Sequence, residues 1–324
     1  MFYKTIRNNM KRFIESVIAR VLSEAIYYRL LQSHSLIRND IHEKQKFMIL
    51  AVYILLFIFS FSNYMQAQNL KTQKRIADSL FQSERFYDAI TEYKRLLFFS
   101  ALDDHNYESN AKIGLCYKAG GKYSDAIKYF AIAKSNSKNI EDSVFTELQV
   151  IKINILRRTV PEALLLLNSM EGKYPNKIDS STICYWRGWA YIMDDKWELA
   201  SIEFDKINSE HPLKKLADRV ELEKYSVAFA KFASFIIPGS GQFYTGNYMS
   251  GILSLGWNVL WGYLTINAFV TERAVEGILI GSLLWARFYK GNFQNAEKFA
   301  VDRNKEISNK AYEYLSKKYA GEKP

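Results

Sequence analysis

Small and large apolar positions in the middle of the chain recur with a period of 37 residues. Alanine returns at this spacing four times, at Ala89, Ala126, Ala163 and Ala200. Twelve residues before each alanine stand Ala77, Gly114, Ile151 and Gly188, and four residues after it stand Tyr93, Phe130, Leu167 and Phe204. A small residue on one helix allows a large one on the next to pack closely, so the pattern predicts four helix-turn-helix units.

Glycine and proline mark where these helices are expected to turn. Gly120 and Gly121 are predicted to form the turn of the second unit, and Pro161 suits the first turn of a helix in the third. Pro175 and Pro212 are again 37 residues apart and are expected to end units three and four. The third unit fits the repeat least well.

These positions resemble the tetratricopeptide repeat family, most clearly in Ile113–Ala133 and Trp186–Ile207. The resemblance covers about residues 70–216, and its period of 37 is longer than the family's usual 34. It implies an α-solenoid that binds proteins on a concave groove lined by the first helix of each unit. The groove residues that it implies are Lys74, Asp78, Phe81, Glu108, Lys118, Lys152, Tyr185, Trp189 and Met193. Alternatively, Trp189 and Met193 pack only against neighbouring helices.

An apolar run without charges, Met48–Phe61, precedes the repeats. Its length is typical of a signal peptide, with cleavage expected after Ala67, and an uncleaved anchor is the alternative. Residues 1–47 are long for the segment before such a run. They are interpreted either as a cytosolic extension with a short amphipathic helix over Phe13–Ile26, or as the product of a start codon assigned too early.

A second apolar region follows the repeats, because Phe232–Thr271 contains no Asp, Glu, Lys or Arg. Met249–Val270 is long enough to span a membrane, and Ala274–Tyr289 is shorter, so the two are predicted to form a transmembrane hairpin. Gly277 and Gly281 permit close helix approach, either within the hairpin or between copies in a homo-oligomer.

A glycine-rich motif, PGSGQFYTGNY, lies just before this hairpin, and part of it returns 45 residues later. Its positions are Pro238, Gly239, Gly241, Gln242, Phe243, Tyr244, Gly246, Asn247, Tyr248 and Gly251, echoed by Phe288, Tyr289, Gly291 and Asn292. The motif resembles two-transmembrane modules of bacterial envelope proteins with a PGxGQxYxG signature, which implies contact with membrane lipid over about residues 232–300. It lacks the Lys-Ser/Thr ending of a nucleotide-binding Walker loop.

Charge and composition narrow the classes of function. Of the net charge of +10 in 324 residues, half comes from residues 1–47, a placement typical of a positive-inside flank and not of a nucleic-acid interface. Two Cys and four His at unrelated spacings indicate no metal site, and no catalytic motif or cofactor motif is present.

The sequence therefore predicts an all-α protein whose segments are residues 1–47, 48–67, 70–216, 232–300 and a polar tail, 301–324. The predicted function is a non-enzymatic adaptor, tethered to the bacterial cell membrane with its repeats on the periplasmic side, that binds an envelope protein during assembly of other membrane proteins. The alternative is an oligomeric transporter or channel that uses the repeats for docking or gating. The scarcity of ionisable groups in the apolar segments favours the adaptor.

Overall fold

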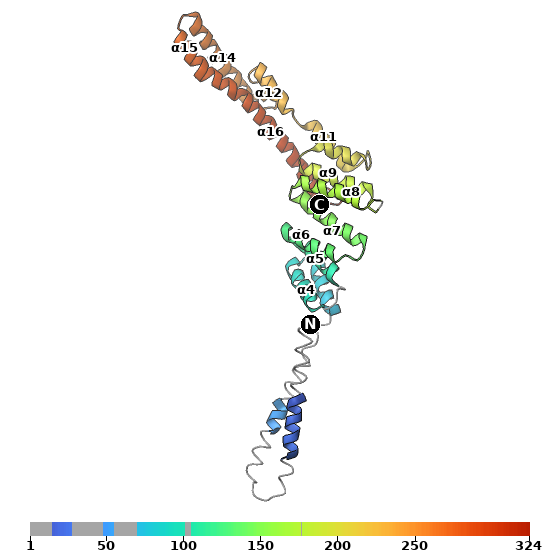
Figure 1. Ribbon diagram of the computed structural model, residues 1–324. Coiled ribbons are helices and arrows are strands. Elements are labelled where there is room, and N and C mark those ends of the chain that lie inside the picture. The colour runs from blue at the N-terminus through green and yellow to red at the C-terminus, as the bar shows by residue number, and fades with distance from the viewer. Residues whose placement is uncertain (1–14, 28–47, 55–69, 101–104, 176) are drawn as a thin grey trace. The chain divides into compact units, whose positions relative to one another are not determined.

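The computed structural model describes residues 15–27, 48–54, 70–100, 105–175 and 177–324, and every regular element in these ranges is helical (Figure 1). The chain divides into two units, Met1–Asn69 and Leu70–Pro324. In the first unit, residues 15–27 and 48–54 are helical. The proposed cleavage position after Ala67 lies outside the described residues. All that follows concerns the second unit.

Four helix pairs form the repeats, as the period of 37 predicts. They are α3 (Leu70–Gln82) with α4 (Phe86–Phe99), α5 (Asn106–Ala119) with α6 (Tyr123–Ser135), α7 (Ile140–Leu156) with α8 (Val160–Lys173), and α9 (Ser180–Met193) with α10 (Trp197–Asp205). Each helix packs against the next one along the chain. All four repeat alanines are fully buried.

Complementary side-chain sizes hold each helix pair together. A Cβ added to Gly114 would lie 3.0 Å from the Phe130 ring, and one added to Gly188 would lie 2.6 Å from the Phe204 ring. In the third unit Ile151 replaces the glycine of the second and fourth units, and Leu167 replaces their larger phenylalanine. Both residues belong to one buried core cluster. The third unit therefore keeps the packing of the others by exchanging sizes between the two helices.

The turns inside the pairs share one backbone conformation. Glu84, Gly121, Arg158 and Asp195 have φ angles of 59°, 68°, 58° and 60°, and they are 37 residues apart. Gly120 has a φ of −78°, so of the two glycines predicted to form the turn only Gly121 occupies the left-handed region. Three of the four turns place an ordinary residue in a conformation that favours glycine.

The chain then continues into a helical hairpin. After α11 (Pro212–Glu223), α12 (Val227–Ile236) and the short α13 (Ser240–Tyr244), α14 (Tyr248–Val270) runs out and α15 (Ala274–Leu279), the π-helix η2 (Ile280–Trp285) and α16 (Ala286–Lys317) run back (Figure 1). Pro212 thus begins α11. Residues expected to form a polar tail belong largely to α16, and Ala311 and Leu315 are buried against the repeats.

The two transmembrane helices predicted over residues 249–289 are not found: in the described residues, no helix is both long and apolar enough to cross a membrane. The first arm, α14, has 23 residues, but Asn258, Asn267 and several glycine, serine, threonine and tyrosine residues reduce its apolar character. The second arm has no separate apolar helix, because α15 has six residues and α16 continues into a charged sequence.

Both glycines of the GxxxG step face the inside of the hairpin. A Cβ on Gly277 would lie 2.9 Å from the Phe269 ring, and one on Gly281 would lie 3.0 Å from the Thr265 methyl group. Phe269 and Thr265 belong to α14, the opposite arm. Both glycines therefore allow the two arms of one chain to approach, which is the first of the two roles considered for them.

Candidate functional site

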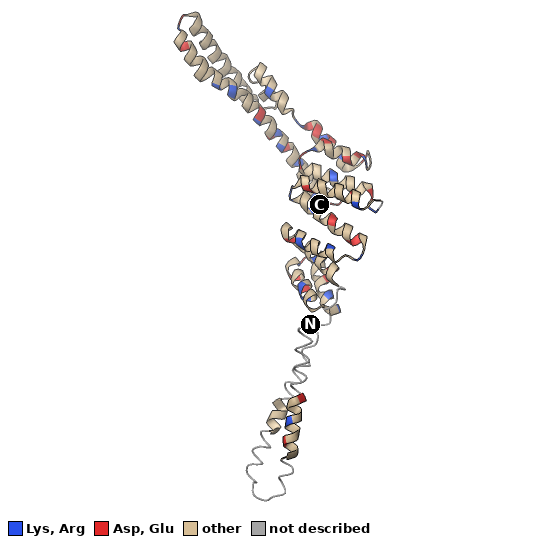
Figure 2. Ribbon diagram, viewed as in Figure 1, with Lys and Arg blue, Asp and Glu red and all other residues tan. Residues whose placement is uncertain are grey.

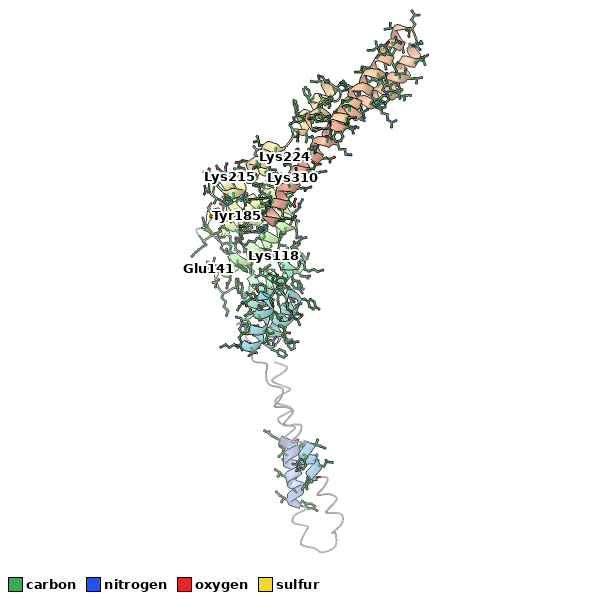
Figure 3. The ribbon with its side chains drawn as sticks, turned by 180° about the vertical axis from the view of Figure 1, so that it is seen from behind. Lys118, Glu141, Tyr185, Lys215, Lys224 and Lys310 are labelled. Carbon is green, nitrogen blue, oxygen red and sulfur yellow. The ribbon has the colours of Figure 1, made fainter. Side chains whose placement is uncertain are left out.

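The chain's own C-terminal segment crosses the first helices of the repeats. We call the surface at this crossing the tail site: Lys152 on α7 and Tyr185 and Trp189 on α9 contact the segment, and Lys118 on α5 and Gln149 on α7 are bonded to each other beside it. Figure 3 labels Lys118 and Tyr185, two positions on separate repeat units. Four of these five residues were predicted to line the groove, so the structure brings that part of the prediction together.

The basic half of the tail site contains two lysines and one carboxylate. Lys152 is buried, lies 4.2 Å from the centre of the Trp186 ring and forms an ion pair with Glu322 of the tail. Lys118 donates a hydrogen bond of 3.1 Å to the Gln149 side chain. Burial, together with the charge of Lys152, lowers the pKa of Lys118 to about 8, although Glu322 acts in the opposite direction. The lysines therefore retain an excess of positive charge.

The aromatic half of the site holds Tyr319. The hydroxyl groups of Tyr185 and Tyr319 are 3.1 Å apart, and the Tyr185 hydroxyl also donates to the backbone oxygen of Glu322. The Trp189 and Tyr319 rings meet edge to face with their centres 6.0 Å apart. Trp189 is only 3 % exposed, yet its indole N–H has no hydrogen-bond partner among the described residues.

Other predicted groove residues lie apart from the tail site. Lys74 and Glu108 form an ion pair of 2.5 Å between the first two units. Asp78 accepts a hydrogen bond of 2.6 Å from the Tyr93 hydroxyl, so it serves packing within its own unit.

Two further predicted residues take part in packing. Phe81 packs in the core of the first unit, with the ammonium group of Lys112 4.4 Å from the centre of its ring. Met193 packs against the core of the fourth unit.

Sequence reasoning missed Gln149, Trp186, Tyr319 and Glu322. The two tail residues had no signal, because a short polar segment beyond a helix has no periodicity that would indicate where it docks. Gln149 could have been found, since it lies three residues before Lys152 and therefore on the same helix face.

The glycine motif forms a buried hydrogen-bond cluster at the base of the hairpin. Asn292 on α16 accepts hydrogen bonds from the Gly239 backbone (2.8 Å) and the Ser254 hydroxyl (2.7 Å), and donates to the Ser234 backbone oxygen (2.6 Å). Gln242, which is fully buried, donates to the Asn292 backbone oxygen (3.0 Å). The cluster joins α12, α13, α14 and α16.

Close backbone contacts explain the glycines of this motif. A Cβ on Gly239, which has a φ of 95°, would lie 2.4 Å from the backbone oxygen of Gly251. One on Gly241 would lie 2.1 Å from the Ala230 backbone oxygen. Gly246 has a φ of 77°, a conformation that favours glycine. Gly291 has no such requirement, because nothing lies within 4 Å of a Cβ added there. Most of the motif's glycines therefore serve the fold, and no phosphate is needed to explain them.

The remaining motif residues divide between packing and exposure. Phe288 stacks on Trp257 and Trp261, and the Tyr289 hydroxyl donates to the backbone oxygen of Phe235. Asn247 precedes α14, and Pro238 lies in the turn before α13. The side chains that face outward are Phe243, Tyr244 and Tyr248.

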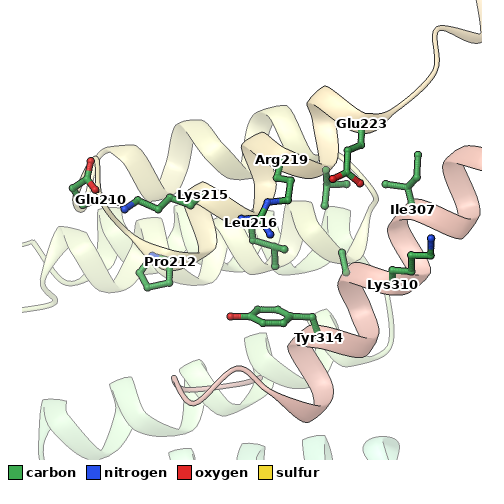
Figure 4. Close-up of a pocket in the computed structure, with 11 residues that line it drawn as sticks. Glu210, Pro212, Lys215, Leu216, Arg219, Glu223, Ile307, Lys310 and Tyr314 are labelled. Carbon is green, nitrogen blue, oxygen red and sulfur yellow. Dashed lines mark ion pairs between the residues drawn. The ribbon is translucent and has the colours of Figure 1, made fainter.

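A cavity of about 440 Å³ lies between α11 and α16 (Figure 4). Figure 4 shows Lys215 and Arg219 on one side and Lys310 and Tyr314 on the other. Its remaining lining is largely aliphatic, with two glutamates at the rim. This lining provides charge and apolar surface but no thiol or imidazole for nucleophilic catalysis.

Both cysteines are buried in the repeats. Burial raises the pKa of the Cys116 thiol to about 11, and burial likewise raises the pKa of Cys184. A thiol that remains protonated is a poor nucleophile and a poor metal ligand. No group of metal-ligating side chains occurs in the described residues.

Comparison with known proteins gives one partial likeness. No family model matches the chain, and no curated protein matches it. A crystal structure of a tetratricopeptide repeat protein from Parabacteroides merdae aligns with 78 % of this chain and 94 % of its own, at 15 % identity and a TM-score of 0.39. This score is too low to assign a fold. The helix-pair repeats described above come from the structure of this chain alone.

Proposed function

We propose that this protein is a non-enzymatic scaffold that binds another protein on the first helices of its repeats. One observation carries the proposal: side chains from two successive units contact a single peptide segment at the tail site, and Lys118 of the preceding unit lies close enough to feel the charge of Glu322. Such a surface recognises an extended segment through several units at once. The protonated, buried thiols favour a binding role over nucleophilic catalysis.

Site-specific photocrosslinking tests this function. A photoreactive residue at Tyr185 is expected to capture a defined protein in native membranes. The control position is Tyr87, which is 84 % exposed on the second helix of the first unit. The proposal fails if both positions give the same adducts, or if Lys152→Glu leaves the adducts from position 185 unchanged.

We further propose that the hairpin attaches the scaffold to lipid. The side chains of Met249, Ile252, Val259 and Tyr263 on α14 are more than half exposed, as are those of Ile278 and Leu283 on the returning arm. In Figure 2, α14 carries no charged residue. An apolar surface of this extent indicates an interaction with lipid or protein, and the exposed aromatic rings at its base suit the headgroup region.

Flotation with liposomes tests the attachment. The purified protein is expected to float with vesicles of phosphatidylethanolamine and phosphatidylglycerol, and Ile252→Glu with Val259→Glu is expected to release it. Leu222→Glu is the matched control, because Leu222 is 87 % exposed on α11, away from the hairpin. Unchanged flotation of the double variant would contradict lipid attachment.

We propose that the repeats lie on the periplasmic side of a bacterial cell membrane. The apolar run from Met48 supports this orientation. A cysteine placed at Tyr87, which is 84 % exposed on the repeats, is then expected to react with an impermeant thiol reagent that is added from the periplasmic side. Absence of labelling from that side would contradict the proposal.

A further inference from the structure

The tail, which we define as residues 319–324, is held loosely although the surface beneath it is well built. The side chain of Glu322 is 65 % exposed, whereas that of its partner Lys152 is 9 % exposed. Apart from Tyr319 and Pro324, the tail residues are exposed. Ala311 and Leu315 of the preceding α16, by contrast, are buried against the repeats. The tail can therefore leave without unfolding the helix that delivers it.

The tail also satisfies the site incompletely. The indole N–H of Trp189, whose ring meets that of Tyr319, has no hydrogen-bond partner among the described residues, so the tail leaves one buried donor at this surface unsatisfied. Two lysines lie near one tail carboxylate, and within the described part of the chain the hydrogen bond of Lys118 goes to the neutral Gln149 side chain. The surface therefore suits a ligand with more negative charge than the tail carries.

We propose that the tail site binds a partner segment that contains an aromatic residue and two acidic residues, three and four positions after it. Tyr319 and Glu322 occupy the same subsites in the free protein, so the tail competes with the partner. This inference rests on the proposed function as a protein scaffold, and it adds the chemistry of the partner and a mode of regulation.

The competition follows from the tail being part of the same chain. A tethered segment is present at a high effective concentration near its site, in the millimolar range for a short flexible link, even when its own contacts are weak. The side chain of Glu322 is 65 % exposed, so water weakens its ion pair with the buried Lys152. A partner segment must therefore bind more tightly than the tail, and removal of the tail is expected to raise its apparent affinity about tenfold.

Fluorescence anisotropy with labelled peptides tests the proposal on the full chain. The probes are KKYAGEKP, which is the sequence of residues 317–324, and KKYAGEEP, which adds the second carboxylate. The chain truncated after Lys318 is expected to bind both, with the more acidic peptide bound more tightly, and wild type is expected to bind about tenfold more weakly. Lys317→Ala, on the exposed end of α16, is the control that leaves binding at the wild-type level.

Three further variants separate loss of the tail from loss of the fold. Gly321→Ala is expected to weaken the tail's contact without removing it, because a Cβ there would displace the Tyr319 hydroxyl. Lys152→Glu in the truncated chain is expected to abolish binding. Adding Glu322→Lys to full-length Lys152→Glu should restore the contact between tail and site, which is measured as protection of the tail from carboxypeptidase.

The outcomes are distinct. Absence of peptide binding by the truncated chain, or binding that survives Lys152→Glu, overturns the inference. If wild type and the truncated chain bind the peptides with equal affinity, the tail does not compete with a partner segment. If the peptides fail while position 185 still crosslinks to a protein in a manner that depends on Lys152, the proposed function stands and this partner chemistry is wrong.

Discussion

The repeats and the base of the hairpin are held together by opposite means. In the repeats, each helix pair closes on a small residue and a large apolar one, such as Gly188 and Phe204. At the base of the hairpin, closure depends on buried hydrogen bonds centred on Asn292 and Gln242. Apolar packing tolerates an exchange of side-chain sizes between the two helices, as Ile151 with Leu167 shows. In a buried polar cluster, by contrast, every hydrogen-bonding group needs its partner.

Asn292→Leu should have the largest effect, because it removes the centre of the cluster and leaves the Gly239 N–H and the Ser254 hydroxyl without their acceptor. We expect a loss of about 3 to 5 kcal/mol in the local stability of the hairpin base. Hydrogen exchange should accelerate around residues 235–251 and remain unchanged around Ala126. Asn247 is the equivalent residue of the first motif copy, and the hydrogen bonds of its side chain within the described residues go to Thr245 alone. Asn247→Leu is therefore the control, and equal effects of the two variants would refute the comparison.

Gly188→Ala tests the apolar means of closure. Its Cβ would lie 2.6 Å from the Phe204 ring, so the α9–α10 pair must separate, at a cost of about 2 to 3 kcal/mol. Phe204→Leu in the same chain should recover more than 1 kcal/mol, because it approaches the size combination of the third unit. Urea unfolding followed by circular dichroism measures both. Gly172→Ala, whose Cβ would meet nothing within 4 Å, should cause no loss.

Lys118→Met examines the charged surface of the repeats. Folding lowers the pKa of Lys118 from 10.5 to about 8, so the folded protein binds this proton less tightly than the unfolded chain. The free-energy cost of folding with Lys118 protonated is present in full below pH 8 and disappears as the pH rises from 8 to 10.5. The variant should thus be more stable by about 1 kcal/mol at pH 7 and lose this advantage by pH 10.5. A gain in stability that does not depend on pH would contradict the lowered pKa of Lys118.

The smallest effects are expected in the turns between paired helices. Glu84→Gly should stabilise the first unit by about 0.5 to 1 kcal/mol, because Glu84 occupies the left-handed region with a φ of 59°. Gly121→Ala should cost a similar amount, whereas Gly120→Ala, at a φ of −78°, should not. Thermal unfolding of the three variants decides whether this turn conformation carries strain throughout the repeats.

Local size patterns predicted the repeats well, because the packing partners of a helix pair lie a fixed 16 residues apart, as Gly114 and Phe130 do. The membrane prediction for Met249–Val270 was less successful, since run length alone does not count the polar side chains within the run. The tail site was found in part. Its lysines and aromatic rings follow the repeat, but its occupant, Tyr319 with Glu322, lies more than 120 residues away from them, and no local pattern records such a contact.

The length of α16 gives the molecule a mechanical property. Its 32 residues correspond to about 48 Å of continuous helix. One end carries Asn292 in the polar cluster and the other carries Leu315 in the repeat core, immediately before the tail. A helix of this kind is a stiff lever. A force that tilts the hairpin would be transmitted to the point where the tail leaves α16, so under the proposed competition tension at one end of the helix would alter occupancy of the tail site at the other.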